Sequence, residues 1–154
     1  MSYHLPERKA EQAFKAYFGA ITGVSIRTRF SGAVKDLPEL TIVCANCDPA
    51  IREENQSVSE WACDLSFTIR TRYIKQDMAE GDAHDVIVGA VSDMIADSTI
   101  ADLVNYPDSG LNAFGALLDF KAVLWKPGSR RNRIDDKDYV TELTGTLWLV
   151  PSAT

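Results

Sequence analysis

The chain has 154 residues, of which 45% are hydrophobic and 25% are charged, and its formal net charge is −6. The length suits one domain with its own core, and the negative balance argues against a dedicated nucleic-acid-binding protein, although a local basic patch stays open. No apolar run approaches the roughly 20 residues that a membrane-spanning helix needs, and the polar, charged beginning lacks the pattern of a secretory signal. We therefore expect a single domain over residues 1–154 with no membrane partner.

The first predicted element is an amphipathic helix over residues 6–20. Apolar residues recur there at helical spacing, while charged residues occupy the other side. Pro6 suits the first turn, because the N–H that proline lacks would have no partner there. Gly19 and Gly23 predict the end of the helix, and residues 24–30 form a candidate strand.

A hairpin of two strands is predicted next. Residues 39–47 form a short strand that Asp48-Pro49 is expected to end, and residues 50–59 are a polar connection. Residues 60–74 then alternate strictly between polar residues and residues that can be buried. The residues that can be buried are Trp61, Cys63, Leu65, Phe67, Ile69 and Tyr73, with Thr71 as the one weak position. This alternation predicts a half-buried strand, antiparallel to the one before it.

The strand over residues 60–74 is long. About 14 residues at about 3.3 Å each would span about 45 Å, whereas most strands have roughly 3–10 residues. One small core does not usually cover that length. We expect the strand either to bend or to project and pair outside its own subunit, which favours an assembly protein.

The second half predicts a helix and a second hairpin. Asp82 is the expected N-cap of the helix, and Ser98 or Thr99 would cap a second, shorter helical piece. The apolar face of the main helix is predicted to consist of Val86, Ile87, Ala90, Val91, Met94 and Ile95. Residues 116–126 and 139–150 are strands, the latter with Tyr139, Leu143, Leu147 and Leu149 on one face. The layout predicts an α+β fold: a mainly antiparallel sheet of about four to five strands, with the N-terminal and central helices packed on one face.

The chemical motifs are sparse. Cys44 and Cys47 form a C-x-x-C pair, but residues three apart on a strand point to opposite faces, and a structural zinc site needs four ligands. We expect the three cysteines to be free thiols, with no metal or cofactor. His84-Asp85 could be a general base with its orienting carboxylate, but a lone surface histidine beside a helix start is more often incidental. No nucleophile elbow or phosphate-binding loop accompanies it, so we do not expect an enzyme.

The stretch from residue 126 to 138 is predicted to be a long charged loop. It holds five cations, Lys126, Arg130, Arg131, Arg133 and Lys137, against the three acids Asp135, Asp136 and Asp138, an excess of two positive charges. A structureless connection of roughly 12 residues is near the upper limit for compact domains. Two interpretations stay open: a solvated, mobile hairpin tip, or a contact arm that touches an acidic neighbour or a nucleic-acid strand threading a ring.

A second set of arginines lies on the long strand. Arg70 and Arg72 occupy its polar face, and the tetrapeptide Ile-Arg-Thr-Arg at 69–72 repeats the one at 26–29. The simpler interpretation is that these arginines face water. The alternative is that they face a neighbouring acidic subunit, with Glu53 and Glu54 as candidate partners across the boundary.

Four segments carry a resemblance to a known family: ERKAEQAFKAYF, WACDLSFTIRTRYI, AHDVIVGAVSDMI and the closing hairpin FKAVLWKPG…YVTELTGTLWLV. In layout and pattern the chain resembles the tail terminator proteins of long-tailed bacteriophages, the group that caps the tail tube and meets the head–tail connector. The resemblance implies a homo-oligomeric ring, commonly a hexamer, of α+β subunits without catalysis. It implies the tail tube protein and head–tail connector proteins as partners, with DNA passing non-specifically through the ring.

The same resemblance implies a location in the tail or neck of the virion, after assembly in the host cytoplasm. Related neck and tail-completion proteins share much of this layout and stay as alternatives. A small cytosolic α+β module that binds a metabolite or peptide is the alternative from another class, and an enzyme is the third.

Overall fold

The computed structural model describes residues 5–28, 38–50, 60–72, 78–96, 120–135 and 138–151. In chain order its elements are α1 (Pro6–Tyr17), the short 3₁₀ helix η1 (Phe18–Ala20), β1 (Ser25–Thr28), β2 (Glu39–Ala50), β3 (Glu60–Arg72), α2 (Met78–Ile95), β4 (Phe120–Asp135) and β5 (Asp138–Pro151). The predicted α+β fold, with an N-terminal and a central helix beside a mostly antiparallel sheet, is confirmed. No helix within the described ranges is long and apolar enough to cross a membrane.

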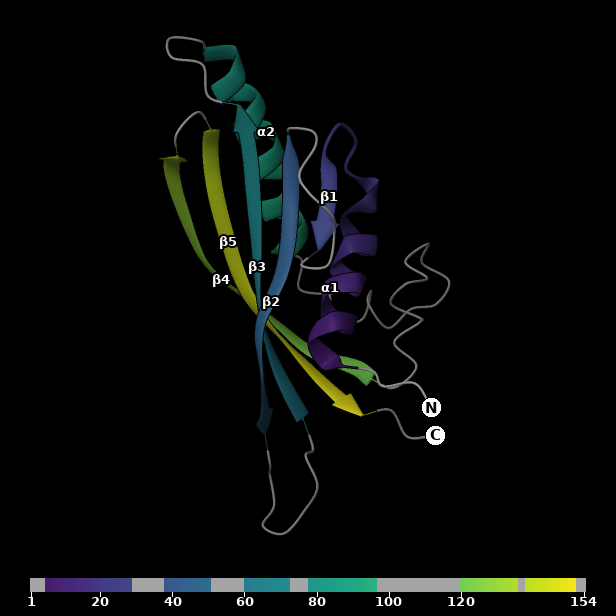
Figure 1. The fold of residues 1–154 in the computed structure, drawn as a ribbon. Helices are drawn as coiled ribbons and strands as arrows, with labels where there is room; N and C mark the ends of the chain where they lie inside the picture. Colours follow the sequence, from purple (N-terminus) through teal and green to yellow (C-terminus); the bar gives the residue numbers. More distant parts are fainter. Residues whose placement is uncertain are drawn as a thin grey trace.

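The sheet has the strand order β1-β2-β3-β5-β4, in which β1 and β2 are parallel and all other neighbours antiparallel. Figure 1 shows β3 in the middle, with α2 behind the central strands. The ends of β2 and β3 at Ala50 and Glu60 extend past α1, whereas at the opposite end of the sheet α2 reaches beyond the tip of the β4–β5 hairpin (Figure 1). At that end of β3, however, Glu60 is buried and Trp61 packs against the core, so the expectation that the long strand bends or pairs outside its own subunit stays a prediction.

Both helices pack against one face of the sheet and form a single core with it. The centre of this core is aromatic: the ring of Phe14 on α1 lies 5.0 Å from that of Phe67 on β3 and 4.8 Å from that of Trp125 on β4. Two aromatic donors also fix the end of α2. Trp125 Nε1 donates to the carbonyl of Ile95 at 2.7 Å, and the Tyr17 hydroxyl donates to that of Met94 at 2.8 Å. These bonds satisfy carbonyls that the last turn of a helix leaves without helical partners.

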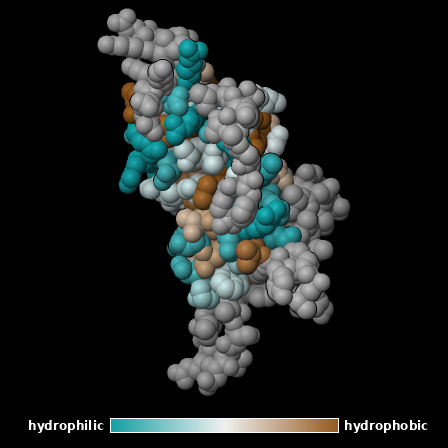
Figure 2. Space-filling model, viewed as in Figure 1, coloured by the Kyte–Doolittle hydropathy of each residue, from teal (hydrophilic) through white to brown (hydrophobic). Residues whose placement is uncertain are grey.

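The alternation predicted for the central strand is confirmed from Cys63 to Thr71, whereas Trp61, which was predicted to be buried, is partly exposed and Glu60 is buried. The side chains of Cys63, Leu65, Phe67, Ile69 and Thr71 are buried, while those between them are partly exposed. The face of the sheet away from the helices is therefore polar. Figure 2, in the same view as Figure 1, shows hydrophilic residues over much of the described surface, with a few apolar side chains between them.

The predicted end of β2 at Asp48-Pro49 is wrong, because the strand continues through both residues to Ala50. Pro49 lies opposite Trp61 on β3. On its other side the described part of β1 pairs with β2 as far as Ile42, so no described strand lies beside residue 49 on that side. A proline is tolerated where its missing N–H would not have joined the ladder.

Two predictions for α2 are also wrong. The helix begins at Met78, so Asp82 lies inside it and is not its N-cap. Val86 is 72% exposed, whereas Val88 is buried together with Val91 and Ile95, so the buried face is rotated from the predicted one. The helix is apolar on several sides, and the pattern alone did not indicate which side packs. The shorter helical piece predicted after Ser98 lies outside the described residues.

The predicted charged loop is wrong as well, because residues 127–135 belong to β4 and pair with β5. The register shifts by one residue between Pro127 and Arg130, which is a β-bulge. Ser129 N donates to Thr144 Oγ1 at 2.9 Å within it. Pro-Gly-Ser was therefore a signal for a bulge and not for a turn, and the strand resumes after it as far as Asp135.

Candidate functional site

Among the described strands, β4 forms one edge of the sheet and is paired on one side only, with β5. Residues 126–134 are all exposed. Four of them are cations, Lys126, Arg130, Arg131 and Arg133, which we call the basic edge. The strand also exposes two large apolar side chains, Leu124 at 47% and Ile134 at 58%, on either side of these cations. Leu124 lies opposite Trp148, on the face that no described helix covers, whereas Ile134 lies opposite Tyr139, on the other face. Apolar area beside cations is suited to contact with an acidic surface.

The register divides the basic edge between the two faces of the sheet. Arg130 lies opposite Leu143, which faces the core, whereas Arg131 and Arg133 lie opposite Glu142 and Val140, on the face that no described helix covers. The sequence alone placed the three arginines in one loop. The strand instead presents Arg131 and Arg133 together and turns Arg130 away from them.

The edge is poorly suited to direct strand pairing with another chain. Pro127 lacks an N–H, and β4 has register shifts between Ala122 and Leu124 and between Pro127 and Arg130. Prolines, bulges and charged side chains are the devices by which edge strands avoid uncontrolled pairing. Contacts at β4 would therefore be made by side chains.

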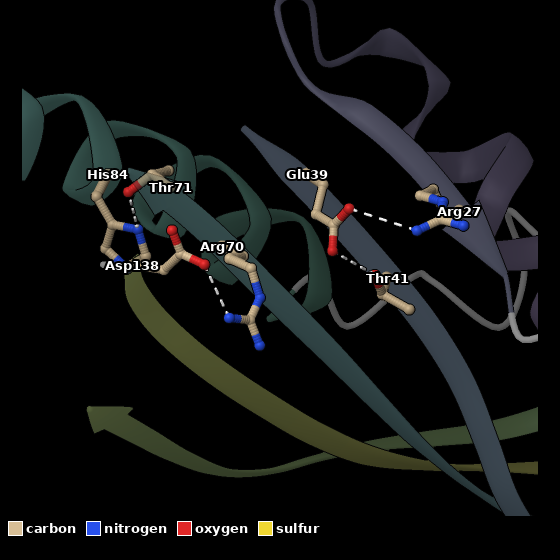
Figure 3. A network of polar contacts seen from close by, with 7 residues as sticks. All are labelled: Arg27, Glu39, Thr41, Arg70, Thr71, His84 and Asp138. Carbon is tan, nitrogen blue, oxygen red and sulfur yellow. Dashed lines mark hydrogen bonds and ion pairs between the residues drawn. The ribbon is translucent and has the colours of Figure 1, made fainter. Parts of the chain in front are cut away.

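The other predicted contact residues are placed differently. Arg70 Nη1 lies 2.9 Å from Asp138 Oδ2 within the same chain, and Arg27 Nη1 lies 3.5 Å from Glu39 Oε2 (Figure 3). Both ion pairs are partly buried. Arg72 is exposed at the end of β3, while Glu53 and Glu54 lie outside the described residues. Arg70 is thus engaged within its own subunit, and the pairing proposed for it across a boundary stays a prediction.

His84 is not the surface histidine that the sequence suggested, because it is buried between α2 and the sheet. Its Nδ1 lies 2.8 Å from Thr71 Oγ1, and its Nε2 lies 2.8 Å from Thr141 Oγ1 (Figure 3 shows the Thr71 side). The Thr141 hydroxyl donates to Asn132 Oδ1 at 2.8 Å, so Nε2–H of His84 donates to Thr141 Oγ1. When the ring is neutral, Nδ1 accepts from the Thr71 hydroxyl.

The electrostatics agree with this assignment. Burial lowers the pKa of His84, and the neighbouring Asp85 carboxylate opposes this effect by a smaller amount. Both ring nitrogens are engaged in hydrogen bonds, so the imidazole links α2 to β3 and β5. It is therefore not poised to act as a general base. Beside it, Asn132, Arg133, Ile134 and Tyr139 help to line an open cavity of about 410 Å³.

The cysteines depart most from the predicted chemistry. Cys47 and Cys63 form a disulfide, so the expectation of free thiols is wrong for both, while Cys44 is a buried thiol outside the disulfide. The register shift between Cys44 and Asn46 inserts Ala45 as an extra residue in β2. An extra residue reverses the alternation, and Cys44 and Cys47 consequently share a face. The C-x-x-C spacing alone could not reveal this bulge.

The uncovered face also carries a polar network across three strands. The Asp64 carboxylate accepts hydrogen bonds from Asn46 Nδ2 at 2.7 Å and from Thr146 Oγ1 at 2.9 Å. It thereby ties β2, β3 and β5 together on that face. No protein-family model matches this chain, and no curated protein matches it either.

Proposed function

We propose that the chain is a structural virion protein: a tail terminator of a long-tailed bacteriophage that caps the tail tube as a ring and joins it to the head–tail connector. The observation that supports this proposal most is the basic edge on β4. All four of its cations are exposed, on a chain whose net charge is −6. Removing these four positive charges from −6 leaves −10 on the rest of the chain, so one copy's basic edge is complementary to the remaining surface of the next copy.

A contact between two different patches on successive copies is head-to-tail, and it closes into a ring when the rotation between copies allows it. An exposed ion pair contributes only about 0–1 kcal/mol. In a hexameric ring each pair recurs at every interface, and the exposed Leu124, on the same face as Arg131 and Arg133, adds apolar area beside it. Arginines that face the lumen would meet the phosphates of passing DNA without reading its sequence.

The two ends of the sheet supply the contacts along the ring axis. The β2–β3 end lies at one end of the sheet, past α1, and the β4–β5 tip lies at the other end, beside α2 (Figure 1). In the proposed ring, one end meets the tail tube protein and the other meets the head–tail connector proteins. The protein is then located in the tail or neck of the virion, after assembly in the host cytoplasm. Another neck or tail-completion protein would use the same surfaces with different neighbours.

The test compares two pairs of charge reversals. In Arg131→Glu with Arg133→Glu, two exposed cations of the basic edge on the uncovered face are reversed. In Arg8→Glu with Lys15→Glu, two exposed cations on α1 are reversed, with the same change in net charge. We expect the edge variant to sediment as a folded monomer and the α1 variant to form the same oligomer as the wild type. Equal assembly of both variants would contradict the proposal.

One observation favours the cytosolic binding module as a second candidate. The cavity of about 410 Å³ beside His84 lies within the range of about 300–1,000 Å³ that is usual for small-ligand sites. Thermal shift against a panel of metabolites separates the two functions. A ligand that raises the melting temperature of the wild type but not of Tyr139→Ala, with the protein monomeric throughout, would favour the binding module.

A further inference from the structure

The three cysteines of the chain converge on one place. Cys44 and Cys47 come from β2 and Cys63 from β3, where it lies directly opposite Cys47. Their three Sγ atoms all lie within 4.8 Å of one another, and the Cys44 and Cys47 Sγ atoms are 3.6 Å apart. Cys44 and Cys63 are fully buried, while Cys47 is partly exposed. We call this the thiol cluster.

The backbone around the cluster is held by more than the sheet. The described part of β1 pairs with β2 as far as Ile42, and beyond that point the buried Glu11 of α1 approaches β2. Its Oε2 accepts the N–H of Cys44 at 2.8 Å. With the Ala45 bulge on one side and this hydrogen bond on the other, Cys44 is fixed with its sulfur toward Cys47.

The cluster has two covalent states. In one, Cys47 and Cys63 are joined and Cys44 is a thiol. A dithiol reductant converts this to the second state: it transfers two electrons and two protons, the bond between Cys47 and Cys63 breaks, and the reductant becomes a cyclic disulfide. Three thiols then face one another, and the partly exposed Cys47 is the point that solvent can reach.

We propose that in the reduced state the thiol cluster binds one soft, closed-shell metal ion through three thiolates. Thiolate sulfur selects ions such as Cu(I) and Zn(II) over hard cations. Three sulfurs in a triangle complete the trigonal coordination that Cu(I) adopts, whereas Zn(II) would require a fourth ligand from solvent or another molecule. Binding releases the thiol protons, so affinity rises with pH.

The shape of the cluster favours an ion over disulfide exchange. In an exchange step, the attacking sulfur approaches along the axis of the bond that it breaks. With a disulfide bond of about 2.05 Å and the 3.6 Å approach of Cys44 to Cys47, that alignment would place the outer sulfurs about 5.6 Å apart. They lie within 4.8 Å, which is a triangle and not a line.

The experiment titrates the full chain anaerobically with Cu(I), Zn(II) and Mg(II), after reduction with a phosphine that is then removed. Bound metal per chain is measured by mass spectrometry, and Cu(I) affinity by competition with a chromophoric chelator. We expect one Cu(I) per reduced chain, weaker or no Zn(II), and no Mg(II). The oxidised chain should bind at least about tenfold more weakly, because two of its three ligands are joined.

The variants make the test specific. Cys44→Ser leaves the pair Cys47 and Cys63 in place, and should lower Cu(I) affinity at least about tenfold, because a hydroxyl is a poor ligand for a soft ion. Ala45→Ser changes an exposed residue of the same bulge and should bind as the wild type does, while circular dichroism checks the fold of both. Equal affinity of wild type and Cys44→Ser would overturn the proposal, and so would a reduced wild type that retains no Cu(I).

Discussion

His84 shows how one buried side chain can couple the stability of this fold to pH. Its folded-state pKa is lowered by burial, so the unfolded chain takes up a proton more readily than the folded one. The neutral His84 therefore makes its full contribution to the stability of the fold above the pKa of about 6.5 that it has in the unfolded chain. This contribution is lost as the pH falls below that value toward the pKa of His84 in the folded chain.

We predict that the melting temperature of the wild type falls between about pH 7.5 and about pH 5.5, where few other side chains titrate. In His84→Gln, a side chain without a titrating group replaces the imidazole, and the curve should be nearly flat over this range. The readout is the slope, so a lower melting temperature of the variant does not affect it. A fall of the same size in both proteins would show that another group is responsible.

Gly145 gives a second prediction at the scale of single residues. A Cβ built on Gly145 would collide with the indole ring of Trp125, the same ring that bonds to the end of α2. Gly145→Ala should therefore lower the free energy of unfolding by about 1–3 kcal/mol, through overpacking of a filled core. Chemical denaturation measures this change in the free energy of unfolding.

The same substitution on α2 provides the control. A Cβ at Gly89 would meet no atom within 4 Å, and the residue is exposed inside a helix. Gly89→Ala should raise the free energy of unfolding by about 0.5–1 kcal/mol, because alanine loses less backbone entropy in a helix. A Gly145→Ala variant that is as stable as the wild type, or more stable, would refute the packing assigned to Trp125.

At the scale of elements, the periodic spacing of apolar residues along the chain predicted part of the fold. The helix at Pro6, the alternation of β3 and the final strand were all predictable, because each buries one regular face. The bulges in β2 and β4 were not predictable, because the residue inserted at a bulge does not alter the composition of the strand. It nevertheless moves every later side chain of that strand to the opposite face of the sheet. The bulge in β2 brings the three cysteines together. The bulge between Pro127 and Arg130 in β4 allows the strand to continue, as the basic edge, through residues that were predicted to be a loop.

The strand character of residues 130–134 can be measured directly. An edge strand donates about every second N–H to its neighbour, while the other N–H groups face solvent. Residue-resolved hydrogen exchange should show alternating protected and unprotected amides from Arg130 to Ile134, all paired against β5. Uniformly fast exchange would indicate a solvated loop and would contradict the described pairing.

At the scale of the whole molecule, one sheet face is covered by two helices, and the other is polar and uncovered by any described helix. The proposed ring uses the basic edge on one side of each subunit and acidic surface on the other. Exposed charges are screened at separations beyond about 8 Å at physiological ionic strength. We predict that the oligomer dissociates progressively as salt is raised from about 0.05 M to about 1 M, as sedimentation velocity would record. An oligomer that tightens with salt would indicate an apolar interface in place of the proposed one.

The most direct test of the proposed ring is the mass of the purified wild-type chain under native conditions at low salt, with images of the same sample by negative-stain electron microscopy. A closed ring of identical subunits, six in the form that the resemblance implies, is the predicted result, and the Arg131→Glu with Arg133→Glu variant should yield the mass of one subunit. A wild type that remains a monomer or a dimer at every concentration that can be reached would contradict the central claim.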